Sequence, residues 1–201
     1  MEFSNIIASR RSIRKFRPEA LSDETIGRLL DAARLAPSGS NLQPSRFVVA
    51  RSPWAKEALG RCTPYTFIAR AAVIFVCCAD LTALSTRDKR IGELLDAGAF
   101  EGIDVTIPST PPNPNAVMDG EAARAYLSLN VAIAVEHMVL AAVDLGLGSC
   151  WIGRFDKDKV RETLNLDETI HPVALLPVGH PDQSPGPRPR LGLDQLVLKT
   201  I

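Results

Sequence analysis

Eight residues near the N-terminus, 10–17, concentrate positive charge and carry the first candidate chemistry. The segment reads RRSIRKFR, with five cationic residues in eight, although the chain as a whole balances 23 Lys and Arg against 23 Asp and Glu. The planar guanidinium of arginine forms paired, charge-assisted hydrogen bonds with phosphate oxygens. The stretch therefore predicts binding of an anionic ligand, most simply a phosphate, with a solvated basic turn as the alternative.

A second candidate is the polar loop at residues 36–45, which reads APSGSNLQPS. Two prolines bracket it and small hydrogen-bonding residues fill it, so composition alone predicts a turn. The loop comes directly before a predicted strand at 46–50. Its density of hydroxyl and amide groups marks it as a place where a polar ligand could be held.

A glycine-rich turn at residues 146–153, GLGSCWIG, is the third candidate. It begins like a dinucleotide-binding fingerprint, but Trp151 occupies the third glycine position and the turn follows a predicted helix instead of a strand. That interpretation therefore fails. Gly146 and Gly148 are explained as a helix-terminating turn, whereas Gly153 permits a close backbone approach because it lacks a Cβ atom.

The fourth candidate is the pair Arg188 and Arg190, which flank Pro189 near the C-terminus. Residues two apart in an extended chain lie on the same side. The two guanidinium groups could therefore act together on one phosphate, and a basic tail turn is the alternative.

No constellation of side chains for acid–base or nucleophilic catalysis is evident in the sequence. The cysteines, Cys62, Cys77, Cys78 and Cys150, show neither a CxxC motif nor a Cys/His ligand spacing, so no zinc or iron–sulfur site is predicted. Buried free thiols in a reducing cytosol are expected instead. We predict no catalytic side chain and no metal.

Composition predicts an ordinary globular protein of 201 residues, 46% hydrophobic and 23% charged, in one domain. Zero net charge argues against general binding of nucleic acid or anionic membranes. The N-terminus lacks a signal-peptide pattern and no 18-residue stretch is free of polar interruption, so a cytoplasmic protein without a membrane span is expected.

Hydrophobic periodicity predicts several elements that would position the candidates. Ser22 is expected to cap a helix that has Asp23 and Glu24 in its first turn. The apolar run 71–79 predicts a strand buried on both faces. Pro177 indicates that the last strand lies at an edge or carries a bulge. Shorter elements are expected as helices at 2–9, 54–59 and 156–164 and as a strand at 172–179.

The longest predicted helix covers residues 121–144 and is apolar on nearly every side. A helix of about 24 residues is about 36 Å long, and one that is hydrophobic all round must be buried all round. A two-fold dimer interface achieves this more easily than one domain of this size. Asn130, Glu136 and His137 argue against a membrane span and need polar partners.

Residues 98–118 carry four prolines within seven positions, 108–114, and cannot hold regular structure there. Loops of this length are usually lids, binding loops or disordered. A lid over a site and a mobile surface insert both fit.

The motif RRSIRKF, followed by APSGSNLQP before a strand, resembles the nitroreductase family of FMN-dependent oxidoreductases. GLGSCWIG and the later VGHP are similar to further family motifs, and the resemblance runs from residue 8 to about residue 190. Ser45 stands where many family members carry Trp.

The resemblance implies an α+β fold, a three-layer α-β-α sandwich around a mostly antiparallel sheet. The chain would form a single nitroreductase-like FMN-binding domain over 1–201 in a homodimer, with the long helix at the subunit interface. Residues 98–118 would be the family's variable loop or lid. Residues 191–201 would form an arm exchanged in the dimer, where residues 193–201 could be a strand donated to the partner.

The resemblance also implies an FMN site between the subunits. A main-chain N–H near Ile152 or Gly153 would bond flavin N5, and Arg14 would lie near the N1/O2 edge. The implied cofactor-binding residues are Arg10, Arg11, Ser12, Arg14, Pro37, Ser38, Ser40, Asn41, Gln43, Trp151, Ile152, Gly153, Arg188 and Arg190.

The implied activity is that of an NAD(P)H-dependent flavoprotein oxidoreductase. Hydride would pass from NAD(P)H through flavin N5 to a flat acceptor such as a nitroaromatic or a quinone. Two alternatives stay open. One is dehydrogenation or dehalogenation on the same scaffold, and the other is a non-catalytic FMN-binding protein.

Overall fold

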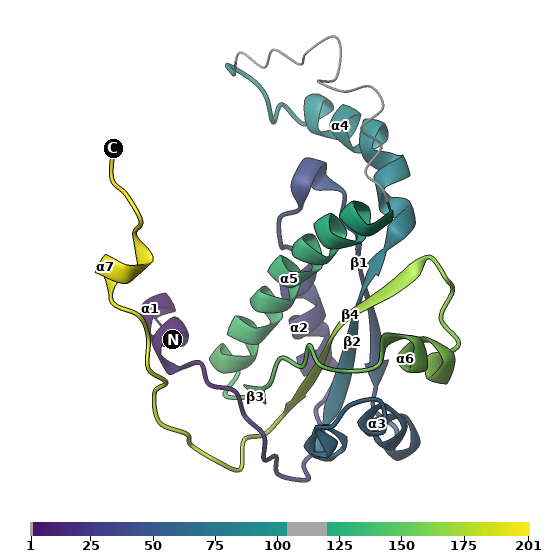
Figure 1. The fold of residues 1–201 in the computed structure, drawn as a ribbon, viewed down its shortest axis with the longest axis vertical. Coiled ribbons are helices and arrows are strands. Elements are labelled where there is room, and N and C mark those ends of the chain that lie inside the picture. The colour runs from purple at the N-terminus through teal and green to yellow at the C-terminus, as the bar shows by residue number, and fades with distance from the viewer. Residues whose placement is uncertain (1, 104–119) are drawn as a thin grey trace.

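A four-stranded antiparallel sheet forms the centre of the protein in a computed structural model that describes residues 2–103 and 120–201. The strand order is β1-β2-β4-β3 (Figure 1). The strands are β1 Ser45–Ala50, β2 Val73–Asp80, β3 Gly148–Ser149 and β4 Ile170–Gly179.

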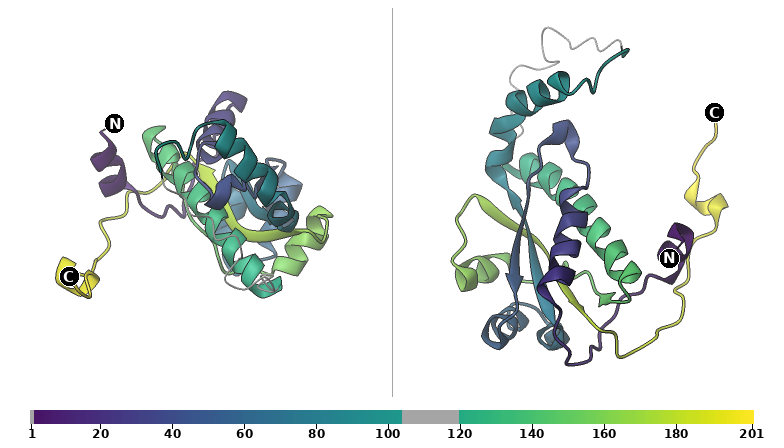
Figure 2. Two further views of the ribbon diagram at one scale, coloured as in Figure 1. Left: turned by 90° about the horizontal axis from the view of Figure 1, so that it is seen from above. Right: turned by 180° about the vertical axis from the view of Figure 1, so that it is seen from behind.

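Helices cover both faces of this sheet (Figures 1 and 2). On one face lie α2, Asp23–Arg34, and α5, Gly120–Asp144; on the other lie α3, Pro53–Gly60, and α6, Lys157–Leu164. The predicted three-layer α-β-α sandwich is therefore confirmed. The remaining helices are α1 Phe3–Ser9, α4 Arg87–Asp96, α7 Leu193–Leu196 and the 3-10 helices η1 Gly39–Asn41, η2 Thr66–Arg70 and η3 Leu81–Thr86.

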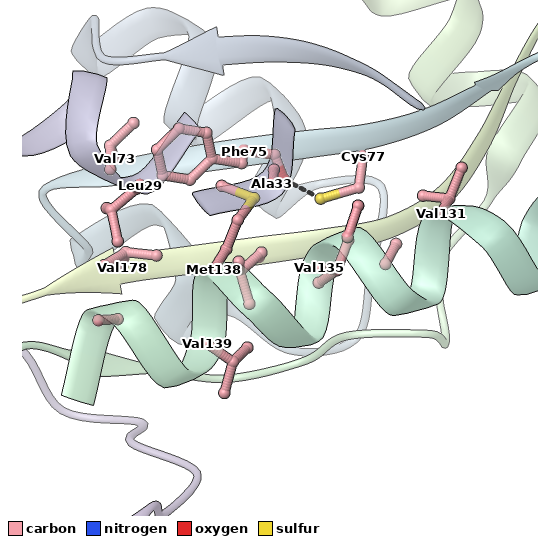
Figure 3. Packing of buried hydrophobic residues seen from close by; sticks show 14 of the residues in the cluster. Leu29, Ala33, Val73, Phe75, Cys77, Val131, Val135, Met138, Val139 and Val178 are labelled. Carbon is pink, nitrogen blue, oxygen red and sulfur yellow. Dashed lines mark hydrogen bonds between the residues drawn. The ribbon is translucent and has the colours of Figure 1, made fainter. Parts of the chain in front are cut away.

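Strand β2 is buried on both faces, as its unbroken apolar sequence predicted. Successive side chains of a strand point to opposite faces, and the two faces of β2 belong to two separate core clusters. Figure 3 shows the first cluster, in which Phe75 of β2 packs among residues of α2 and α5. The first cluster takes Val73, Phe75, Cys77 and Ala79, and the second takes Ile74, Val76 and Cys78.

The cysteines behave as the sequence predicted. Cys62, Cys77, Cys78 and Cys150 are all free and buried. Burial raises the pKa of the Cys78 thiol to about 12 and holds the pKa of Cys77 well above its ordinary value. These two thiols stay protonated and unreactive at neutral pH.

Helix α2 begins as predicted. The Ser22 hydroxyl accepts a hydrogen bond of 3.1 Å from the Thr25 N–H, and Asp23 and Glu24 occupy the first turn. The core-facing stripe of the helix is buried at Ile26, Leu29 and Ala33.

Helix α5 packs one face on α2 and the sheet and leaves the other uncovered. Leu127 and Met138 are fully buried, whereas Leu129 is 62% exposed. By length and composition alone the helix could cross a membrane, with a mean hydropathy of 1.6 over its best window. Its buried side belongs to the core cluster that it forms with α2 and the sheet.

The expectation for Pro177 needs correction. Strand β4 lies inside the sheet order, and its register shift falls at Cys77/Cys78, opposite Pro172 and Ala174, not at Pro177. The Pro177 carbonyl accepts from the Cys150 N–H at 3.3 Å, so Pro177 turns its polar backbone atoms toward β3. Because β3 has only two residues, the missing N–H of Pro177 removes little pairing there.

Two other expectations concern the tail and the proline-rich loop. The suggested strand over residues 193–201 is wrong for its first half, because Leu193–Leu196 form the short helix α7. The segment after β4 leads away from the sandwich (Figures 1 and 2). Most of the predicted loop 98–118 falls on residues 104–119, which lie outside the described residues.

Replacing a core leucine of α5 tests this packing. Leu127→Ala deletes a fully buried side chain and is expected to lower the free energy of unfolding by about 2–5 kcal/mol. Leu95→Ala in α4 is the matched control, since Leu95 is 53% exposed and its loss is expected to change stability by less than about 0.5 kcal/mol. Equal destabilisation of both variants in denaturant titrations would contradict the packing.

Candidate functional site

Three segments that are distant in sequence meet beside β3. The Ile13 N–H donates to the Ser149 carbonyl at 2.8 Å, which pairs the basic stretch with the glycine-rich turn. The Arg17 N–H donates to the His180 carbonyl at 2.9 Å, and the Asp182 N–H donates to the Lys15 carbonyl at 2.9 Å. The basic stretch is thus fixed as an extended segment between β3 and the chain that follows β4.

Extended geometry divides the side chains of the basic stretch between two sides. Arg10, Ser12 and Arg14 lie toward Cys150. Burial raises the pKa of the Cys150 thiol, while Arg14, the Ser12 hydroxyl and Arg10 oppose that rise, in that order. Two cations and a hydroxyl therefore act on the Cys150 thiol, Ser12 through its pairing with Ser149 and Arg14 in the same cavity, which suits an anionic ligand.

Arg11 lies on the opposite side. It lines a separate cavity of about 380 Å³ with Ile13 and Leu147. Its Nη1 donates to the carbonyls of Ala8 at 2.7 Å and Arg10 at 2.8 Å, so it closes the end of α1. Its Nε is buried without a partner among the described residues. This placement does not support the predicted role of Arg11 as a ligand alongside Arg10.

Arg14 opens onto a cavity of about 190 Å³ that combines cationic and aromatic groups. No carboxylate of the described residues lines it, so its potential is positive. The Tyr65 and Phe67 rings, with centroids 6.4 Å apart, form part of the wall. The lining consists of Arg14, Tyr65, Phe67, Cys150, Trp151, Ile152, Gly153 and Arg154.

The backbone hydrogen bonds of Ile152 and Gly153 decide which of their two N–H groups could bond a ligand, as was predicted for one of them. Ile152 is buried, and its N–H donates to the Leu175 carbonyl at 3.0 Å while its own carbonyl accepts from the Leu175 N–H. The Ile152 N–H is therefore not available to a ligand. The N–H of Gly153 has no hydrogen-bond partner among the described residues, and nothing lies within 4 Å of a Cβ built there.

The polar loop has an unusual backbone. Ser40, Asn41 and Gln43 adopt positive φ angles of 49°, 52° and 49°, a region that non-glycine residues rarely occupy. The Ser38 hydroxyl accepts from the Gln43 N–H at 2.9 Å and so closes the turn. Pro37, Ser38 and Gln43 line a cavity of about 280 Å³ against α2 and α5.

The basic stretch and the polar loop lie at different places along α5. The polar loop contacts α5 at Asn130, and the basic stretch reaches it near Val143. Thirteen residues separate these positions, about 20 Å of helix. The cavity at the loop includes no residue of 10–17, and the cavity at Arg14 includes no residue of 36–45.

Arg188 and Arg190 are exposed on the C-terminal segment and line neither cavity. The Nη1 of Arg190 donates only to the neighbouring Pro189 carbonyl at 3.0 Å among the described residues. Their assignment to a phosphate site stays a prediction.

Sequence reasoning missed several residues of these cavities. Tyr65, Phe67 and Arg154 carry no motif that would single them out. Asn130 was visible as a polar residue in an apolar helix, but its partner, Gly39, lies 91 residues away in sequence and could not be deduced.

The sequence and the fold correspond to a known class of oxidoreductases. The chain belongs to the nitroreductase family, whose model matches residues 7–180. An NADH dehydrogenase of Thermus thermophilus is 34% identical over 191 residues, 94% of this chain and 91% of the relative. An FMN reductase (NADPH) of Bacillus subtilis is 30% identical, over 92% of this chain and 68% of the relative.

Solved structures agree with this assignment. A nitroreductase family protein from Streptococcus pneumoniae superimposes with a TM-score of 0.79 at 25% identity, covering 99% of this chain and 100% of the other. A nitroreductase homologue in complex with FMN from Desulfovibrio desulfuricans gives 0.74 at 28% identity, covering 100% and 98%.

Two glycines of the turn are expected to respond differently to alanine. A Cβ at Gly148 would lie 2.7–2.8 Å from Ile13 atoms, so Gly148→Ala should push the basic stretch off β3 and destabilise the protein by about 1–3 kcal/mol. Gly153→Ala meets no neighbour and should change stability by less than about 0.5 kcal/mol. Thermal unfolding, with tryptic cleavage within residues 10–17, measures both; equal stability of the two variants would refute the predicted contact.

Proposed function

We propose that this protein is an FMN-dependent oxidoreductase that takes electrons from NAD(P)H and reduces a flat acceptor such as a nitroaromatic or a quinone. The observation that carries the proposal is the cavity that Arg14 and Gly153 line together, in which the Gly153 N–H has no hydrogen-bond partner among the described residues. The Ser12 hydroxyl and Arg10 act on Cys150, which lines the same cavity, so positive charge, a hydroxyl and an open backbone donor are found in one region.

The groups present fit FMN in kind. The guanidinium groups of Arg10 and Arg14 suit an anionic ligand and the electron-rich edge of a flavin. The hydroxyl and amide groups of Ser38, Asn41 and Gln43 suit the polar ribityl chain and pyrimidine edge. The absence of a Cβ at Gly153 leaves room for a flat ring to approach the backbone.

FMN, when bound, supplies the redox chemistry, accepting a hydride and passing electrons on, and the protein supplies orientation and electrostatics. Arg14 would stabilise negative charge that develops on the reduced ring. The rings of Tyr65 and Trp151, on the walls of the Arg14 cavity, suit stacking against a flat substrate. No side chain is assigned as an acid or base.

We further propose that two chains complete one site. The cationic segment and the polar loop are about 20 Å apart along α5 in one chain, and α5 exposes an apolar face at Leu129, 62% exposed. A two-fold dimer with α5 packed antiparallel would cover that face. It would also bring the basic end of one helix to the polar-loop end of its partner.

The names of the relatives support the donor and the cofactor. The Thermus relative is an NADH dehydrogenase and the Bacillus relative an FMN reductase (NADPH), and the Desulfovibrio structure contains FMN. A cytoplasmic location is proposed because reduced nicotinamide nucleotides and the four free thiols both fit a reducing compartment.

Anaerobic spectroscopy of the FMN-loaded protein tests this function. Addition of NADH or NADPH is expected to bleach the oxidised-flavin absorbance, and a quinone or nitroaromatic is expected to restore it. Arg14→Ala serves as the comparison and should bind FMN more weakly because a cation at the ligand is lost. A protein that binds no FMN would contradict the proposal; bound FMN that neither nucleotide bleaches would favour a non-catalytic FMN-binding role.

A further inference from the structure

We infer that Asn130 is a positioning residue that holds the polar loop in the conformation needed to contact the cofactor, with Tyr126 as its second support. The inference rests on the proposed function, because it assigns Asn130 a task in building that site. Asn130 lines the cavity at the polar loop and not the Arg14 cavity, and it is not offered as a catalytic residue.

Asn130 is a polar side chain in the apolar core. It is 4% exposed on a helix whose neighbouring core residues Leu127, Val131 and Ala134 are apolar. A buried amide is costly unless its polar atoms are paired. Both are paired here: Oδ1 accepts from the Gly39 N–H at 2.7 Å, and Nδ2 donates to the Tyr126 carbonyl at 2.8 Å.

The loop that Asn130 holds is one that would not adopt its shape unaided. Of the four non-glycine residues with positive φ in the described part of the chain, three are Ser40, Asn41 and Gln43. Such conformations cost free energy and persist only where surrounding contacts impose them. Within the loop the bond between Ser38 Oγ and the Gln43 N–H provides one such contact. The bond from Gly39 to Asn130 ties the loop to the core.

Tyr126 restricts Gly39, the residue whose N–H bonds to Asn130, from a second direction. A Cβ at Gly39 would lie 1.9 Å from the Tyr126 Oη and 3.0 Å from its Cζ, so the phenol ring occupies the space that any side chain at Gly39 would need. Tyr126 lies one helical turn before Asn130, on the same side of α5. One turn of α5 therefore fixes both the hydrogen bond and the packing of Gly39.

This arrangement would preorganise the loop for its ligand. Polar groups that are already in place lose less conformational entropy on binding, which raises affinity without any new contact. Loss of the Asn130 support should therefore weaken FMN binding through the changed shape of the polar loop.

The test compares Asn130→Leu, which removes both hydrogen bonds at similar side-chain size, with Asn130→Asp, which keeps an acceptor for the Gly39 N–H. Hydrogen exchange of the FMN-free protein reports the loop directly. Asn130→Leu is expected to speed exchange at Gly39 and Gln43 by about tenfold, with residues 74–78 of β2 unchanged as an internal reference. FMN affinity, measured by flavin fluorescence, is expected to fall about five- to tenfold. Asn130→Asp should restore part of both effects.

Unchanged loop exchange and unchanged FMN affinity in Asn130→Leu would overturn the inference. Faster loop exchange with unchanged FMN affinity would overturn it as well, since FMN binding would then not depend on the hydrogen bond from Gly39 to Asn130. If Asn130→Leu loses protection in β2, the same criteria apply to Asn130→Asp against the wild type. A wild-type protein that binds no FMN, in which loop exchange nonetheless responds to Asn130→Leu, would reject the proposed function and not the support of the loop.

Discussion

The structure depends on the burial of one long apolar helix. Helix α5 packs its core face on α2 and on the central sheet. The polar loop and the basic stretch contact this helix at two different positions along its length. Near its N-terminal half Asn130 bonds the polar loop. At its C-terminal end Gly146 and Gly148 turn the chain into β3, against which the basic stretch pairs. The same helix therefore sets the spacing of the two segments.

Because of that spacing, the cationic groups and the neutral polar groups lie at different ends of α5. Cations gather at the β3 end, where Arg10 and Arg14 lie toward Cys150. The loop end offers hydroxyl and amide groups on a tightly constrained backbone. A ligand with a charged terminus and a polar ring edge needs both sets. In one chain they are too far apart to line a common cavity, which is the physical reason for proposing a site shared between two subunits.

Much of the fold could be predicted because its determinants are local. The Ser22 cap, the apolar run of β2 and the length of α5 follow from short-range rules of capping and periodicity. The basic stretch could be recognised from the sequence as a candidate segment, and its role stays a prediction. The opposite directions of Arg11 and Arg14 could not be predicted, because they follow from the pairing of this stretch with Ser149, which sequence spacing does not reveal.

Other details depended on partners far away in the chain. The Ile152 N–H was a candidate ligand group until its pairing with Leu175 was known. The tail was suggested as a strand donated to a partner because of its apolar residues, yet its first residues form α7, and no strand of the described residues pairs with them. Asn130 and Gly39 meet across 91 residues, and no local rule connects them.

Subunit complementation tests the shared site most directly. One variant carries Arg14→Ala in the basic segment, the other Asn41→Ala in the polar loop, and each alone should bind FMN weakly. After subunit exchange each hybrid dimer would combine both defects at one site and leave the other intact. Random mixing should therefore restore tight binding at about one quarter of all sites. No tight binding after demonstrated exchange would contradict a site built from two chains.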